Sequence, residues 1–179
     1  MRHFLQLAHS IDTMPALAAL AAQPHLWNAH DIRTRYEQSP HHQADDILLF
    51  FNDIPEDFSE VVNDIQTRPY PAWSALPVKD MVLNLMRAVG GVQLGRVIIS
   101  RLAPGASIKP HADQGAPAEF YQRYQIMLQC LPGVLFRAGD ETVQMKTGDA
   151  WWFDNSQEHG VVNNSADDRI ALIVDIRTC

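Results

Sequence analysis

Residues 96–113, RVIISRLAPGASIKPHAD, hold the pattern that decides the fold. Two runs suited to strands, 96–102 and 107–113, flank the turn dipeptide Pro104-Gly105 and predict a pair of short strands. Side chains two residues apart in a strand point to the same face, so His111 and Asp113 are predicted to aim at one point. An isolated His-x-Asp is more often an ordinary solvent-facing strand edge, and the rest of the chain has to decide between the two interpretations.

The same alternation of short strands and turns continues to the C-terminus. The predicted strands cover 96–102, 107–113, 122–131, 134–138, 141–145, 150–153, 158–163 and 169–176, with glycine, proline, asparagine or aspartate between them. Upstream, 13–23 and 75–89 have the apolar spacing of helices, and 47–51 predicts a buried strand. This order indicates an α+β chain, a single domain over 1–179, in which a mainly helical part (1–91) packs on a jelly-roll or small barrel (92–179).

The bulk composition excludes several classes of protein. The 179 residues are 46% hydrophobic and 20% charged, which is typical of a globular chain, and the net charge of −7 argues against binding to nucleic acid or to an anionic membrane. The basic residues are eleven arginines and three lysines, a bias that fits recognition of carboxylates. Cys130 and Cys179 form neither a zinc motif nor a disulfide framework. The N-terminus lacks a signal-peptide run and no stretch is long enough to span a membrane, so we expect a cytoplasmic protein.

A third metal ligand is predicted in the run DNSQEHG at 154–160, which places His159 at the start of the penultimate strand. Two histidines and one carboxylate, His111, Asp113 and His159, leave three coordination positions open, and this set suits the oxygen chemistry of non-heme Fe(II). The other histidines are interpreted as solvated surface residues; they are His3, His9, His25, His30, His41 and His42.

Two strands carry polar side chains on the face opposite their apolar one. On 169–176, Arg169 and Ala171 alternate with four aliphatic residues, and on 122–131 Arg123 and Gln125 alternate with an apolar set. A small residue beside an arginine leaves room for a ligand. A solvent-facing strand pattern explains the same alternation, with Arg169 paired to one of the aspartates that precede it.

With Ser100 eleven residues before His111, and with Arg123 and Arg169 added, residues 97–176 resemble the aspartyl/asparaginyl β-hydroxylase family of 2-oxoglutarate oxygenases. Residues 27–33 and 39–49 are more weakly similar to the upstream segment of that family. The resemblance implies a double-stranded β-helix, a jelly-roll of cupin-like type, that uses Fe(II), 2-oxoglutarate and O2. It places iron on His111 and His159 and the distal carboxylate of 2-oxoglutarate on Arg169 and Ser100. Arg123 then approaches the carboxylate nearer the metal.

The chain departs from the animal members of this family at two positions. They have glycine where Asp113 stands, so the carboxylate ligand is restored here, as in bacterial relatives that act on free amino acids. They have histidine where Gln125 stands. The resemblance therefore implies that Gln125 contacts the cosubstrate, although its side chain differs from that of the animal members.

Two other functions fit part of the pattern. Gly148-Asp149 and the spacing of His159 to Asn163 resemble a cupin motif. This motif is compatible with a metalloenzyme that does not use 2-oxoglutarate, or with a non-catalytic metal- or ligand-binding β-barrel. Arg169 with Ser100 favours the oxygenase, because such a cupin needs no clamp for a distal carboxylate. The substrate is expected to be an amino acid, a peptide or another small polar molecule. Its predicted contacts are Lys109, Gln125, Trp152 and the loop 114–121.

Overall fold

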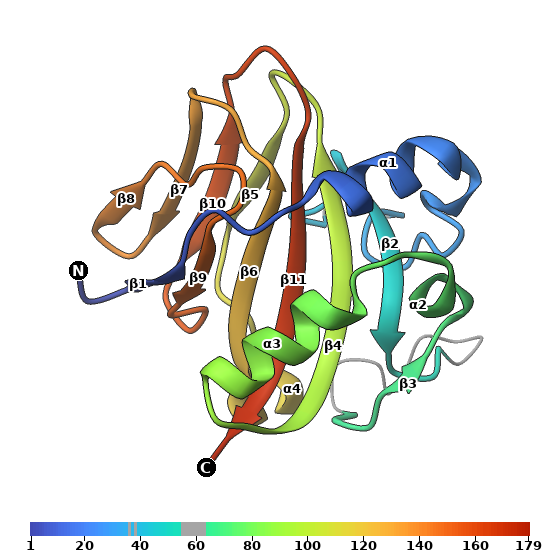
Figure 1. The fold of residues 1–179 in the computed structure, drawn as a ribbon. Coiled ribbons are helices and arrows are strands. Elements are labelled where there is room, and N and C mark those ends of the chain that lie inside the picture. The colour runs from blue at the N-terminus through green and yellow to red at the C-terminus, as the bar shows by residue number, and fades with distance from the viewer. Residues whose placement is uncertain (36, 38, 55–63) are drawn as a thin grey trace.

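The computed structural model describes residues 1–35, 37, 39–54 and 64–179, and over these residues the strands form two antiparallel sheets (Figure 1). The larger sheet has the order β1 (Phe4–Ala8), β9 (Ala150–Phe153), β6 (Gln122–Gln129), β11 (Arg169–Thr178), β4 (Gly91–Leu102), β2 (Ala44–Phe51) and β3 (Arg68–Pro69). The smaller sheet has the order β5 (Ser107–His111), β10 (His159–Asn163), β7 (Val134–Ala138) and β8 (Glu141–Val143).

The chain crosses repeatedly between the two sheets from β4 onward. Strands β4, β6, β9 and β11 belong to the larger sheet, while β5, β7, β8 and β10 belong to the smaller one. Strands next to each other in a sheet are therefore mostly distant in sequence, as β6 and β9 are on one side and β11 and β4 on the other. This winding of one chain through two facing sheets is the jelly-roll architecture, so the predicted fold class is confirmed at that level.

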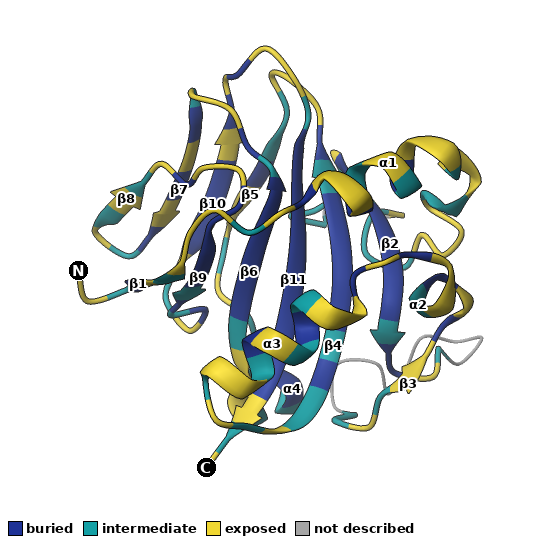
Figure 2. Cartoon of the chain, viewed as in Figure 1, coloured by how far each residue is buried: buried dark blue, intermediate teal, exposed yellow. Residues whose placement is uncertain are grey.

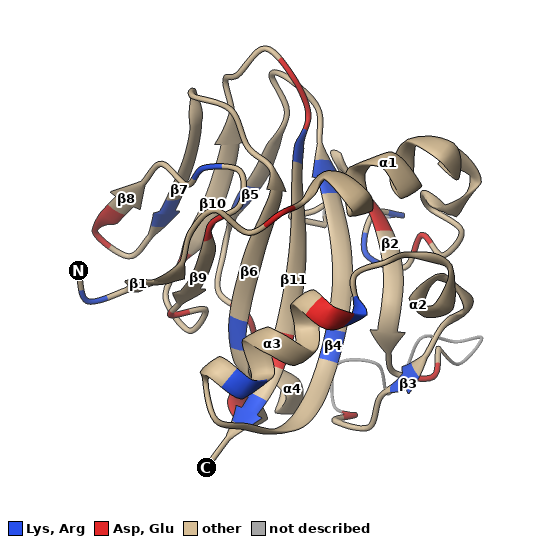
Figure 3. Ribbon diagram, in the orientation of Figure 1, with Lys and Arg blue, Asp and Glu red and all other residues tan. Residues whose placement is uncertain are grey.

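An apolar core fills the space between the sheets. It joins Leu102, Met127 and Ala171 of the larger sheet to Ile108 and Phe136 of the smaller one. The central strands are buried along most of their length (Figure 2), and charged residues are sparse along them (Figure 3). The polar groups that do lie between the sheets therefore stand out as exceptions that need a partner.

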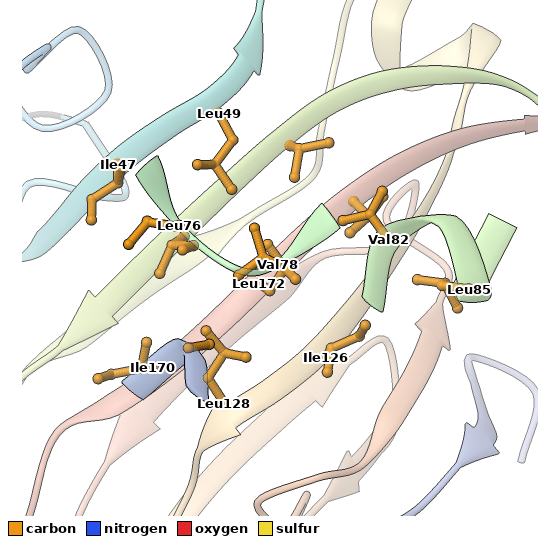
Figure 4. Packing of buried hydrophobic residues seen from close by; sticks show 14 of the residues in the cluster. Ile47, Leu49, Leu76, Val78, Val82, Leu85, Ile126, Leu128, Ile170 and Leu172 are labelled. Carbon is orange, nitrogen blue, oxygen red and sulfur yellow. The ribbon is translucent and has the colours of Figure 1, made fainter. Parts of the chain in front are cut away.

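The opposite face of the larger sheet is covered by helices. These are α1 (Met14–Ala22), α2 (Pro71–Ala75) and α3 (Lys79–Ala88), and α3 crosses the sheet in front of β6 and β11 (Figure 1). Val82 and Leu85 of α3 pack with Ile126 and Leu172 of the sheet in one cluster (Figure 4). Strand β11 is buried on both faces because its alternate side chains enter this cluster and the core between the sheets.

Most element predictions agree with the structure to within a few residues, and 134–138 and 150–153 agree in full. The sequence does not predict strands β1 and β3, the helix α2, a short 3-10 helix (Pro24–Leu26) or α4 (Ala116–Phe120). The predicted helix 75–89 starts only at Lys79, because Leu76 is extended and Pro77 separates α2 from α3. The N-terminal part is not only helical, since β1, β2 and β3 join the larger sheet.

In the described part of the chain, no helix has both the length and the apolar character that crossing a membrane requires.

Candidate functional site

The three predicted metal ligands meet at one end of the smaller sheet. His111 ends β5, His159 begins β10, and the two residues are directly paired in the register of these strands. Their rings lie 4.4 Å apart between centroids, and the candidate ligand atoms of His111, Asp113 and His159 all lie within 4.8 Å of one another. Among the described residues, this is the group whose side chains could hold a metal ion.

Asp113 reaches this point by a different route from the one predicted. Strand β5 ends at His111, so Asp113 lies in the following loop rather than on the same strand face. Its backbone N–H donates to the carbonyl of Asn155 at 3.1 Å, which ties the loop to the segment before His159. A contact between two loops, and not strand alternation, therefore places the carboxylate.

The hydrogen bonds of both histidines leave the same ring nitrogen free for a metal. Nδ1 of His111 donates to the carbonyl of Lys109 at 2.8 Å, and Nδ1 of His159 donates to that of Gln157 at 2.9 Å. Each Nε2 then carries a lone pair, and Nε2 of His111 is buried without a hydrogen-bond partner. Histidines that ligate metals are typically oriented by this kind of bond from the other nitrogen, so the donor set fits a metal ion.

The charges at the site also suit a divalent cation. Burial lowers the pKa of His159 to about 4, which keeps the imidazole neutral at pH 7. Burial by itself would raise the pKa of Asp113, but Arg123, His159 and the hydrogen bond from Asn155 outweigh it and hold that pKa below its usual value. The site therefore offers a neutral imidazole at His159 and a carboxylate at Asp113, which are forms that bind Fe(II).

Deeper between the sheets lies a buried arginine with free hydrogen-bond donors. Arg169 is 1% exposed, and its Nη2 donates to Oε1 of Gln125 at 2.6 Å, while Nε and Nη1 have no partner. Ser100 is fully buried, and its Oγ also lacks a partner. Ser100 lies opposite Ala171 in the β4–β11 pair, so it shares a face with Arg169. Buried donors without partners are costly, and an anion bound here would satisfy them.

Arg123 is engaged by two carboxylates. Its Nε and Nη2 bond both oxygens of Asp175 at 2.8 and 2.9 Å, and its Nη1 bonds Oδ2 of Asp113. The two carboxylates outweigh the effect of burial and raise the pKa of Arg123. The polar side chains of β6 therefore line a polar interior. The alternative interpretation, in which they face solvent, is wrong for Arg123.

Sequence reasoning missed the N-terminal residues that reach the site. The sequence predicts a solvated surface position for His41, and this is wrong: its ring lies edge-on against His111, with 4.8 Å between ring centroids. Arg33 donates from Nη2 to Nδ1 of His41 at 3.1 Å, and its Nη1 lies 3.3 Å from Oδ2 of the buried Asp46. Burial and then Arg33 hold the pKa of His41 well below its ordinary value. The signal for these residues was the similarity of 27–33 and 39–49 to an upstream family segment.

The free space at the site is small. A cavity of about 30 Å³ lies among Arg33, His41, Arg123, Gln125 and Arg169, and the two candidate ligand histidines also line it. It holds about one water molecule, so a larger ligand requires side chains to move. A groove of about 470 Å³ lies on the far side of the larger sheet between α1 and α3, with an apolar lining that includes none of the candidate metal ligands. Chemistry, not cavity size, therefore locates the site.

The structure places the predicted substrate contacts in different environments. Trp152 lies on the outer face of β9 with the helix-side core, so its assignment is wrong, and Trp151, paired with Gln125, is on the inner face. Lys109 is exposed, and its Nζ lies 3.5 Å from the carbonyl of Glu37. The predicted loop 114–121 contains α4 and ends at the buried Tyr121.

The comparisons with known proteins agree with this geometry. A family model described as aspartyl/asparaginyl β-hydroxylase matches residues 71–178, which is more than half of the chain. No curated protein gives a significant match.

Solved structures share the fold over nearly the whole chain. A prolyl hydroxylase from Trichoplax adhaerens, in complex with a hypoxia-inducible-factor peptide fragment, is 10% identical with a TM-score of 0.62, over 98% of this chain and 83% of that one. A 2OG-Fe(II) oxygenase family oxidoreductase from Burkholderia pseudomallei is 15% identical with a TM-score of 0.59, over 98% and 84%. A collagen prolyl hydroxylase of Paramecium bursaria Chlorella virus-1, in complex with 2-oxoglutarate, is 9% identical with a TM-score of 0.58, over 99% and 97%.

Proposed function

Because this chain belongs to the aspartyl/asparaginyl β-hydroxylase family, and is an Fe(II)- and 2-oxoglutarate-dependent dioxygenase, we propose roles for the residues of its site. His111, Asp113 and His159 hold the iron. Arg169 and Ser100 bind the distal carboxylate of 2-oxoglutarate, with Gln125 beside it. Arg123 lies near the carboxylate at the metal end. The reaction hydroxylates an unactivated C–H bond of an amino-acid, peptidyl or other small polar substrate.

The observation that carries this proposal is the unsatisfied guanidinium of Arg169. A side chain that is 1% exposed keeps two nitrogens without partners, on the same sheet face as the unpaired hydroxyl of Ser100. Burial lowers the pKa of Arg169 to about 10, so it stays charged at pH 7 and favours an anion. A cupin that does not use 2-oxoglutarate, or a β-barrel without catalysis, has no need for such a pair. The dicarboxylate cosubstrate is the ligand that accounts for it.

The chain's own groups then have separate tasks. Bound iron with 2-oxoglutarate and O2 supplies the oxidation, in which the oxo acid loses CO2 to give succinate and the substrate gains one oxygen. The paired strands β5 and β10 hold the two imidazoles at a fixed spacing, and the carbonyls of Lys109 and Gln157 fix their tautomers. Arg169 orients the oxo acid from its far end. The phenyl rings of Phe136 and Phe153 line the cavity and exclude water.

The substrate class is proposed from the polar wall beside the metal ligands. Arg33 and His41 line the cavity, and His41 accepts a hydrogen bond at Nδ1 from Arg33, so its Nε2 carries a proton. These donors suit a substrate with a carboxylate or carbonyl group. A neighbour of similar fold is bound to a peptide fragment, so short peptides stay among the candidates together with free amino acids.

The test is iron-dependent formation of succinate from 2-oxoglutarate by the purified protein, followed by a screen of amino acids and peptides for a mass gain of one oxygen. Arg169→Ala should raise the apparent constant for 2-oxoglutarate by about a hundredfold or more, since truncating one partner of a buried charged pair costs about 2–5 kcal/mol. Mn(II) binding should stay intact in that variant. An unaltered constant would reject the placement, and no succinate with any candidate would reject the reaction.

The organisation of the chain is proposed along the same lines. Residues 1–179 form a single domain, in which 1–91 pack on the β-helix core of 92–179. The helix-side cluster supports this, because it mixes Leu20 and Val82 with Leu172. A cytoplasmic location remains a prediction from the sequence.

A further inference from the structure

The two oxygens of Asp113 have different surroundings. Oδ1 lies 3.7 Å from Nε2 of His111 and 4.0 Å from Nε2 of His159, so it faces the position between the two imidazoles. Oδ2 accepts hydrogen bonds from Nη1 of Arg123 and from Nδ2 of Asn155, the latter at 3.0 Å. One oxygen is thus directed to the metal position and the other is held by the protein.

The arginine that holds Oδ2 is itself fixed by the central sheet. Asp175 of β11 lies directly opposite Arg123 of β6 in the strand register. It is 2% exposed, and both of its oxygens bond the guanidinium. Paired contacts of this kind fix the plane of a guanidinium as well as its position. A line of contacts therefore runs from the backbone of the central strand β11 through Arg123 to the carboxylate of Asp113.

This restraint matters because Asp113 lies on a loop, where a carboxylate can turn to present both oxygens to a cation. Two imidazoles and one carboxylate oxygen occupy three of six positions around Fe(II) and leave three open. A 2-oxo acid that binds through two oxygens takes two of these positions, and O2 needs the third. If Asp113 used both oxygens, the position for O2 would be lost.

We propose that Asp175 and Asn155 are positioning residues for the metal, and that they keep Asp113 a ligand through Oδ1 alone. Asp175 acts through Arg123, and Asn155 acts directly on Oδ2. This inference rests on the proposed metal site. The inference gives Arg123 a second role, in addition to its proposed place near the cosubstrate. It also gives a reason for the buried carboxylate of Asp175 in β11, which does not reach the metal position itself.

The test is titration of the metal-free protein with Mn(II) by calorimetry, in the parent protein and in Asp175→Asn and Asn155→Ala. Loss of an outer contact of this kind typically weakens metal binding by about 10–100-fold, and we expect this of both variants. Asp45→Asn is the matched control, because Asp45 also bonds an arginine on the same sheet, Arg101, at 3.0 and 2.6 Å, and its loss should leave Mn(II) binding unchanged. Asn155→Ala removes only a neutral amide, so it remains informative if Asp175→Asn fails to fold.

Water-proton relaxation of the Mn(II) complexes gives a second readout that a merely structural role would not move. It counts the exchangeable waters on the metal, and we expect about three in the parent and about two where Asp113 turns to bind with both oxygens. Folded variants with the affinity and water count of the parent would overturn the inference. A parent protein that binds no Mn(II) would instead overturn the metal site itself, so the two failures are distinguishable.

Discussion

Replacing Arg169 by methionine is predicted to stabilise the free protein and to abolish binding of 2-oxoglutarate. Arg169 is one of the largest fully buried side chains, and two of its nitrogens have no partner. Burial lowers its pKa from the ordinary value to about 10, a difference that corresponds to about 3 kcal/mol of destabilisation from keeping the charged form in the fold. An apolar side chain of similar length removes that cost.

One lost contact opposes this gain. Oε1 of Gln125 accepts from Nη2 of Arg169 at 2.6 Å, and it would be left buried without a donor. An unpaired group of this kind costs about 1–3 kcal/mol, so the net gain in free energy of unfolding should be about 0–2 kcal/mol. Adding Gln125→Leu removes the orphaned acceptor, and the double variant should be more stable than the single one.

The ligand reverses the order of stability. At a hundred times its dissociation constant, 2-oxoglutarate should stabilise the parent protein by about 2.7 kcal/mol through binding to the native state alone. The Arg169→Met variant should show no such increase at the same concentration, with Mn(II) present in both samples.

Urea unfolding of parent, single and double variants, with and without 2-oxoglutarate, measures all of these terms. Two results would refute the reasoning. If both variants are less stable than the parent without ligand, the guanidinium is not an unsatisfied charge in the free protein. If 2-oxoglutarate stabilises Arg169→Met as much as the parent, the cosubstrate does not bind at this arginine.

The remaining predictions concern the metal, pH and the core. One Mn(II) should bind per chain in calorimetry, and this binding should be lost in His111→Ala and in His159→Ala, whereas Asp113→Ala should weaken it less. Unchanged stoichiometry in both histidine variants would contradict the assignment of the metal ligands. His159 should make the metal-free protein about 2 kcal/mol less stable at pH 5 than at pH 7, because its pKa is about 4 in the fold against 6.5 unfolded and the unfolded chain takes up the proton first. Urea unfolding at the two pH values checks this. His159→Gln should reduce the difference by about that amount, and the part that remains comes from His41, whose pKa is also lowered by burial. Leu172→Ala should cost about 2–5 kcal/mol of unfolding free energy, since Leu172 is fully buried beneath the helices, while Leu135→Ala at an exposed position serves as the control with little effect.

The local sequence determined the strands and pointed to the candidate metal ligands. Turn residues and alternating apolar positions mark β4 to β11, because strand periodicity and turn chemistry act over a few residues. The residue types themselves limit the chemistry, and two imidazoles with one carboxylate point to a non-heme iron site. Strand β1 escaped prediction because it is a five-residue edge strand in which Phe4 alone is buried, so its apolar pattern is weak.

The partners of each side chain were decided only by the tertiary structure. The alternation of side chains on β6 and β11 is the same whether the polar face meets solvent or a polar interior. Only the packing of the second sheet shows that Arg123 and Arg169 lie in the interior. His41 looked like a surface histidine in a polar run and instead lies against His111. The contacts of Asp113 with Asn155 and Arg123, and through the latter with Asp175, join loops and strands far apart in sequence. Such pairings follow from how the sheets wind and close, and no local pattern of residues encodes them.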